Sequence, residues 1–167
     1  ASRLGHVPEP FEWTLLAYRL PREPSTPRIA VWRKLRRLGA VQLVDGLVAL
    51  PATARNREQL DWIADEVVDA AGEAWTWTAV PGSKDQQALL AARMSSASAE
   101  EYEAVLDEAQ KLAAAGSPPR RAVERLRREL RRIEDRDHFR PEVGDRAQHA
   151  VHMLDALRHA DDEATVR

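Results

Sequence analysis

The chain has 167 residues, 44% of them hydrophobic, which suits one compact domain or one domain with an appendage. Its 25 basic and 27 acidic residues nearly balance, so any attraction to nucleic acid or anionic lipid has to be local. The sequence contains no cysteine, which excludes disulfides, thiolate zinc sites and cysteine nucleophiles.

Strands and helices alternate in the first part of the chain. A largely apolar run over 12–20 predicts a buried strand that ends before Pro21. Ser25 or Thr26 is expected to cap a helix that ends at Gly39. The apolar stripe of this helix consists of Val31, Leu35 and Leu38.

Residues 41–50 place the dipeptide Asp45-Gly46 between two apolar runs, the typical pattern of a β-hairpin. Asn56 and Gln59 then resemble a capping box at the start of a second helix. The alternating residues 73–80 predict a fourth strand.

This order of elements predicts an α+β fold. Residues 12–82 are expected to form a ferredoxin-like βαββαβ core, with an antiparallel sheet and two helices on one face. Residues 83–163 are expected to form a helical C-terminal extension, the two parts together being a single structural unit. In the extension, a second capping box at Ser98 and Glu101 predicts that 95–98 separates two helices. A helical hairpin with its break at 116–119 and a further helix after Pro141 complete the fold.

Basic residues concentrate on the first predicted helix. No Asp or Glu occurs between Pro24 and Val44. At about 100° per residue, Arg33, Arg36 and Arg37 lie opposite the apolar stripe, with no local counter-charge. Two interpretations are open, a phosphate-binding ridge and an ordinary solvated helix face. The candidate DNA- or anion-binding residues are Arg28, Arg33, Lys34, Arg36 and Arg37.

A second basic stretch covers 120–136, where arginines mix with acidic residues. Glu124 precedes Arg128 by four residues, the favourable orientation for a helical ion pair. The favoured interpretation is a helix whose arginines form salt bridges with acidic residues, and the alternative is an arm that contacts DNA. The candidates of this secondary basic helix are Arg121, Arg125, Arg128 and Arg132.

Three tryptophans are interface candidates. Trp75 and Trp77 lie two residues apart on the fourth strand, so both point to one face. Packing in a core or an interface is favoured over a stacking platform for bases. Trp62 points away from the buried stripe of the second helix and indicates a contact surface. An apolar, half-open sheet needs a cover, which predicts a homodimer.

Catalytic and metal-binding motifs are not found in the sequence. His149, His152 and His159 share one helix face, but no carboxylate motif accompanies them. There is no glycine-rich phosphate loop and no nucleophile elbow. We therefore expect neither enzymatic activity nor a metal or cofactor.

No apolar run approaches the roughly 20 residues of a membrane span, and residues 1–10 lack a signal peptide's pattern, so we expect a cytoplasmic protein without a membrane partner.

Several segments resemble the N-terminal domain of ChrB-type chromate-resistance proteins. They are Tyr18-Arg19-Leu20-Pro21, residues 28–40 and 46–51, Gln59-Leu60-Asp61-Trp62-Ile63-Ala64, Gly72-Glu73-Ala74 and residues 132–139. The resemblance implies a transcriptional regulator of chromate efflux genes that binds operator DNA and releases it when chromate is present. It also implies kinship with PaaX-type repressors and with CRISPR-adaptation nucleases. Because Tyr18-Arg19 stands where those nucleases carry a metal-binding aspartate, nuclease activity is not implied.

Longer ChrB proteins carry a second domain, so we expect either a separate chromate-sensing chain or a chain that continues beyond this sequence. Three functions are therefore possible for this chain. The first is a DNA-binding regulator that acts as a dimer. The second is a protein-interaction or dimerisation module of a chromate-resistance system that does not bind DNA. The third is direct capture of the chromate dianion by the arginine cluster.

Overall fold

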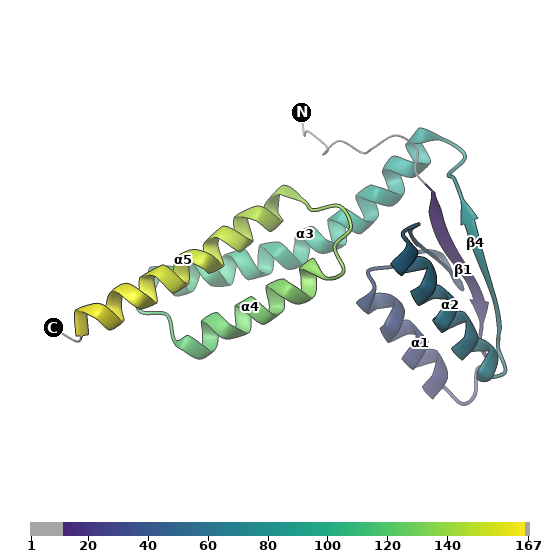
Figure 1. Cartoon of the computed structure of the whole chain (residues 1–167), viewed down its shortest axis with the longest axis horizontal. Helices are drawn as coiled ribbons and strands as arrows, with labels where there is room; N and C mark the ends of the chain where they lie inside the picture. The colour runs from purple at the N-terminus through teal and green to yellow at the C-terminus, as the bar shows by residue number, and fades with distance from the viewer. Residues whose placement is uncertain (1–11, 166–167) are drawn as a thin grey trace. The chain divides into compact units, whose positions relative to one another are not determined.

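The computed structural model describes residues 12–165, with side chains through Leu157, and the chain forms two compact units, Ala1–Met94 and Ser95–Arg167 (Figure 1). The first unit contains all the strands. Its elements are β1 (Trp13–Arg19), α1 (Thr26–Arg37), β2 (Val41–Val44), β3 (Leu47–Pro51), α2 (Ala54–Asp69), β4 (Glu73–Ala79) and the first turns of α3 (Lys84–Ala114).

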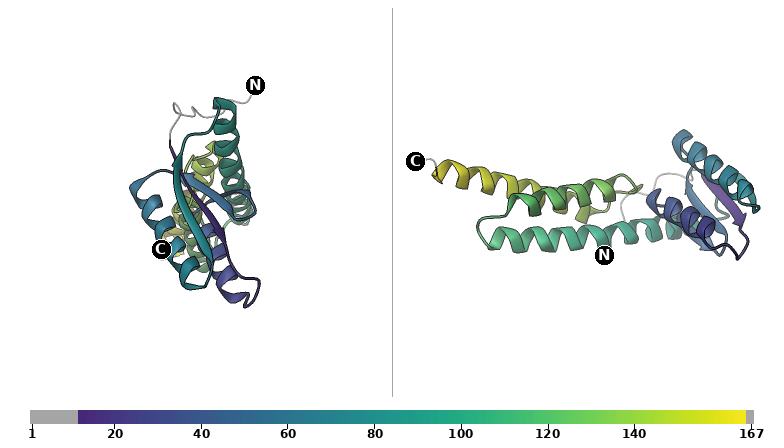
Figure 2. Two further views of the ribbon diagram at one scale, coloured as in Figure 1. Left: turned by 90° about the vertical axis from the view of Figure 1, so that its right-hand side faces the viewer. Right: turned by 90° about the horizontal axis from the view of Figure 1, so that it is seen from below.

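The strands form one four-stranded sheet in the order β2-β3-β1-β4, with every neighbouring pair antiparallel. The register is regular from Trp13 opposite Ala79 to Arg19 opposite Glu73. Helices α1 and α2 both lie on one side of β1 and β4 (Figures 1 and 2). The predicted α+β class and antiparallel sheet are confirmed.

The core of the first unit lies between the sheet and these two helices. Alternate residues of β1 point to the helices, and Thr14 and Leu16 are almost completely buried. The apolar stripes of both helices are buried as well. The residues of these stripes are Val31 and Leu35 on α1, and Leu60, Ile63 and Val67 on α2.

Two caps differ from the sequence-based expectation. Ser25 occupies the N-cap position of α1, but its side chain makes no capping hydrogen bond. Helix α2 is capped by Thr53, whose hydroxyl accepts from the N–H of Asn56 at 3.1 Å. The predicted capping box at Asn56 and Gln59 is therefore wrong. Asn56 lies inside the helix, and its buried amide instead donates to the carbonyl of Pro51 at 2.9 Å.

Helix α3 runs without interruption from Lys84 to Ala114, so the predicted break at 95–98 is wrong. No Gly or Pro occurs between these two residues, and the flanking alanines favour a continuous helix. Ser98 is buried inside the helix rather than placed at its start. A serine with a glutamate three residues later is thus compatible with a helix interior.

Among its described residues, the second unit forms helices and their connecting loops and no strand. It contains the rest of α3, α4 (Arg120–Glu134) and α5 (Glu142–Thr165), which pack around one apolar cluster (Figure 2). The core positions of α4 follow the predicted spacing and are Val123, Leu126, Leu130 and Ile133. The predicted break before α4 is confirmed, because Gly116 adopts a φ of 90° in the connecting loop.

A polar contact connects α3 to the loop that precedes α5. The hydroxyl of Tyr102 donates to the carboxylate of Asp137 at 3.1 Å, and the same carboxylate accepts the N–H groups of Phe139 and Arg140. Burial and the negative charge of Asp137 raise the pKa of Tyr102. A Cβ at Gly144 would lie 3.1 Å from the Tyr102 ring, so this glycine permits the close approach of α5.

Candidate nucleic-acid interface

Helix α1 presents arginines that lack carboxylate partners in the part of the chain that the structure describes. Its buried stripe fixes which face points outward, and four of the five candidates lie on exposed positions. These four are Arg28, Arg33, Arg36 and Arg37. Within residues 12–157, whose side chains the structure describes, none of them forms an ion pair. Their charges are therefore available to an external anion.

Lys34 differs from the other candidates. It is half-buried, and its ammonium group forms an ion pair with Glu66 of α2. Helix α1 contains no acidic residue, as the sequence shows, but the charge of Lys34 is compensated from a second helix. The sequence separation of 32 residues hides the pairing, because only the packing of α1 against α2 brings the two residues together.

A groove with a volume of about 520 Å³ lies beside these arginines, where α1 meets the end of β1 and the β2–β3 turn. Residues from all three places line it, among them Tyr18, Arg28, Trp32, Arg33, Gln42 and Asp45. The groove therefore brings two arginines and the carboxylate of Asp45 beside two aromatic rings. Such a combination suits phosphates accompanied by bases or other planar groups.

Two aromatic residues of this groove, Tyr18 and Trp32, were not predicted as site residues. Trp32 is 48% exposed, and the guanidinium of Arg36 stacks on its ring at 4.9 Å from the ring centre. Trp32 and Arg36 lie four residues apart on one helix, and this spacing could have indicated the contact between them. Burial and the nearby charge of Asp45 raise the pKa of Tyr18, so its hydroxyl remains a hydrogen-bond donor at neutral pH.

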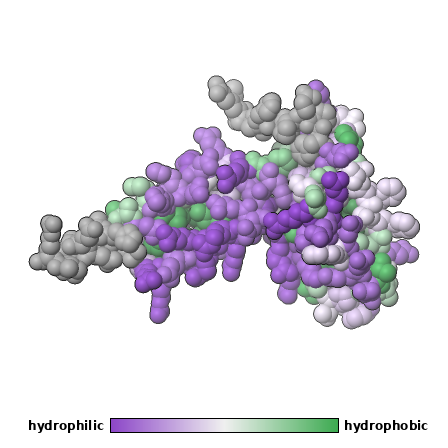
Figure 3. Space-filling view, viewed as in Figure 1, coloured by the Kyte–Doolittle hydropathy of each residue, from purple (hydrophilic) through white to green (hydrophobic). Residues whose placement is uncertain are grey.

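The arginines of α4 have a different environment. Most of them are paired with carboxylates, as the salt-bridge interpretation predicted. The pairs of α4 with other helices are Arg125 with Glu108 and Arg127 with Asp155, and the pairs within α4 are Arg120 with Glu124 at 2.8 Å and Arg132 with Glu129 at 3.8 Å. Arg136, which follows α4, pairs with Glu101 of α3. Arg121, Arg128 and Arg131 form no ion pair with the residues that the structure describes. The expected pair of Glu124 with Arg128 is therefore wrong, because Glu124 pairs with Arg120 on the preceding turn. The surface over α4 is strongly hydrophilic (Figure 3).

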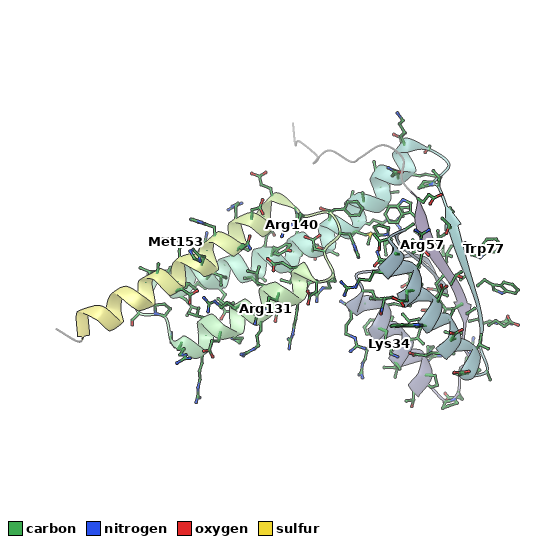
Figure 4. All side chains as sticks on the ribbon, in the orientation of Figure 1. Lys34, Arg57, Trp77, Arg131, Arg140 and Met153 are labelled. Carbon is green, nitrogen blue, oxygen red and sulfur yellow. The ribbon has the colours of Figure 1, made fainter. Side chains whose placement is uncertain are left out.

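The tryptophans of β4 point away from the helices. Trp75 is 67% exposed and Trp77 is 60% exposed, so neither belongs to the core of this chain. Figure 4 shows Trp77 on the side of the sheet opposite to Lys34 and α1. Trp62 on α2 is also exposed, as its position off the buried stripe predicted.

The described residues contain no cluster of three or more metal-ligating side chains. His149 and His152 lie on α5, whereas the side chain of His159 lies outside the described residues. A search of the described helices also finds none with the length and hydrophobicity needed to cross a membrane.

Comparisons with known proteins agree with the resemblance noted in the sequence. A family model described as "Protein ChrB, N-terminal" matches residues 28–115, a range that includes all five candidates of α1. Tyr18 and residues 132–139 lie outside this range. A protein named Protein ChrB from Cupriavidus metallidurans is 36% identical over 75 residues, which cover 45% of this chain and 23% of that protein. No solved structure matches.

Proposed function

The chain belongs to the family of ChrB N-terminal domains, and from this premise we propose that it is a DNA-binding transcriptional regulator of chromate-resistance genes. The observation that carries the proposal is the set of exposed α1 arginines without carboxylate partners among the described residues. In this role Arg28, Arg33, Arg36 and Arg37 contact DNA phosphates.

The fold of the first unit suits this role. We assign the unit to the ferredoxin-like class, and the sheet order supports the assignment, because it is β4-β1-β3-β2 when it is followed from β4. Helix α1 is anchored in the unit by its buried residues Val31 and Leu35 and by its packing against α2. Rigid support keeps the outward arginines at a fixed spacing, which favours binding to the regular phosphates of a duplex.

We further propose that the regulator acts as a homodimer. Two copies related by a two-fold axis present two α1 helices to two DNA half-sites. The exposed tryptophans of β4 support this part of the proposal, because a sheet surface of this kind favours a cover. A separate chromate-sensing chain or domain completes the regulatory response.

The second candidate is a protein-interaction or dimerisation module that does not bind DNA. The same exposed tryptophans, together with Trp62, favour it. The two candidates differ in their response to salt. Phosphate contacts release counterions, so the affinity falls steeply with salt, whereas an apolar protein contact changes little.

The test is a fluorescence-anisotropy titration of the full chain with the DNA upstream of its own gene. A scrambled duplex of equal length serves as the control, and both are measured with and without chromate. We expect binding whose logarithm falls linearly with the logarithm of the salt concentration. Absence of binding at low salt would eliminate the DNA-binding proposal and leave the interaction module. Release by chromate would locate the sensor in this chain, and retention would locate it elsewhere.

A further inference from the structure

Strand β4 forms one end of the sheet, and its outer edge has no strand beside it in the part of the chain that the structure describes. The strand has seven residues, and all of them except the partly buried Ala74 are exposed. The other sheet end differs, because β2 has four residues and its pairing with β3 shifts register between Gln42 and Val44. Short and irregular strands protect a sheet edge from further pairing, and β4 lacks this protection.

The backbone direction of β4 follows from its neighbour β1. The N–H of Tyr18 donates to the carbonyl of Gly46 at 2.7 Å, so Tyr18 directs its backbone groups toward the β3 side of β1. Because these directions alternate along a strand, Leu15 and Ala17 direct theirs toward β4. Their opposite residues are Trp77 and Trp75. The outward backbone groups of β4 therefore belong to Ala74, Thr76 and Thr78.

The residues of the β4 edge favour pairing with another strand and contain none of the features that usually prevent it. Natural edge strands are protected by lysine, proline or a bulge, and β4 contains none of these. Its single charged residue, Glu73, forms an ion pair with Arg19 of the same chain at 2.9 Å. No unpaired charge on β4 therefore opposes the approach of another strand.

We propose that β4 pairs in an antiparallel manner with β4 of a second copy, about a two-fold axis at Thr76, and so joins two sheets into one of eight strands. Thr76 is the middle residue of Glu73–Ala79, so the full strand pairs with itself in this register. Ala74 then lies opposite Thr78 of the other copy, and these pairs use the outward backbone groups. The inference rests on the proposed homodimer and names its surface.

The side chains support a second copy as the occupant. A two-fold axis at Thr76 places Trp75 opposite Trp77 of the other copy, which brings four indoles together on the open face of the sheet. Cross-strand aromatic pairs are among the most stabilising pairs in sheets. If wholly covered, the four exposed indoles would contribute about 600 Å² of buried area, about half of what a stable interface requires.

A cysteine cross-link tests the register directly, since the natural chain has no cysteine. In the proposed pairing the two copies of residue 76 are a hydrogen-bonded pair with Cα atoms about 5.5 Å apart, which suits a disulfide. We therefore expect the full-length Thr76→Cys variant to form a covalent dimer under mild oxidation. The matched control is Ala79→Cys on the same strand, because its two copies would lie about 20 Å apart. Equal cross-linking of both variants, or of neither, would overturn the register.

Sedimentation equilibrium tests the surface without a cross-link. Thr76→Pro removes an outward N–H, which the monomer does not use, and we expect it to weaken dimerisation at least about 30-fold. Thr76→Val keeps the N–H and should keep the dimer. Trp77→Ala should weaken the dimer at least about 10-fold, whereas Trp62→Ala on α2 should not.

The outcomes separate this inference from the proposed function. A natural chain that stays monomeric at micromolar concentration overturns the pairing, and a salt-dependent DNA affinity would still stand. A dimer that Thr76→Pro leaves intact overturns the β4 surface and leaves the homodimer itself in place. If Thr76→Pro loses helix content in circular dichroism, the two cysteine variants decide the question.

Discussion

Helices α1 and α4 are both rich in arginine, yet their charges have different partners. Four arginines of α1 have no carboxylate partner among the described residues, whereas five arginines in and next to α4 form ion pairs, three of them with α3 or α5. The two helices therefore share a high arginine content but differ in how much of that charge is paired: none of the four α1 arginines forms an ion pair with a described residue, whereas in α4 only Arg121, Arg128 and Arg131 lack one. A cluster of arginines indicates a binding surface only where the fold leaves its charge unpaired.

The largest effect is expected on DNA binding by α1. Replacing Arg33, Arg36 and Arg37 together by alanine should lower the affinity for any duplex at least about 100-fold at low salt, because three phosphate contacts are lost. The free energy of unfolding should change little, since these side chains are exposed. Anisotropy titration and urea denaturation measure the two quantities. If the variant binds DNA with the same affinity as the natural chain, these arginines do not contact DNA and form an ordinary solvent-exposed helix face.

The next effect concerns stability in the second unit. Arg127→Ala removes the ion-pair partner of Asp155, whose side chain is only 11% exposed. We expect the free energy of unfolding to fall by about 2 kcal/mol, because a largely buried carboxylate is left without its partner. DNA affinity should not change. The matched control is Arg131→Ala, which removes an exposed arginine that pairs with no carboxylate in the described part of the chain, and it should cost less than about 0.5 kcal/mol.

A smaller effect is expected for the hydrogen bond between Tyr102 and Asp137. Tyr102→Phe should lower the free energy of unfolding by about 1 kcal/mol. The raised pKa of Tyr102 means that the folded chain holds the phenol proton more tightly than the unfolded chain does. This contribution is complete below a pH of about 10 and is lost as the pH rises above that value. Urea denaturation across alkaline pH, followed by circular dichroism, should show a steeper loss for the natural chain than for the variant.

The smallest effect is expected at Lys34. The ion pair with Glu66 is partly exposed at both ends, so Lys34→Ala should change the free energy of unfolding by less than about 1 kcal/mol. It should also weaken DNA binding less than Arg33→Ala does, because the lysine charge is already compensated. Equal losses of affinity for the two variants would show that the pairing with Glu66 does not decide which residues bind.

Local patterns predicted most of the fold. Asp45-Gly46 located the hairpin, and the apolar stripes located α1, α2 and α4 because these signals act within one or two turns. The sequence-based prediction failed where the same local pattern occurs both at the start of a helix and in its interior. Ser98 and Glu101 suit a helix start, yet the surrounding helix formers continue α3 through them.

The candidate site was only partly predictable for a related reason. The outward direction of Arg33, Arg36 and Arg37 follows from helical periodicity. The pairing of Lys34 with Glu66 and the groove between Tyr18 and Trp32 depend on how distant elements pack. No periodicity within one element contains that information.

The central claim, that α1 rather than α4 supplies the charges that bind DNA, is tested most directly by the salt dependence of two matched triple variants. One replaces Arg33, Arg36 and Arg37 by alanine, and the other replaces Arg121, Arg128 and Arg131, which also lack ion pairs among the described residues. The slope of log K against log salt should flatten by about 2.7 for the α1 variant, at roughly 0.9 for each lost contact, and stay unchanged for the α4 variant. An unchanged slope for α1 together with a flattened slope for α4 would contradict the claim.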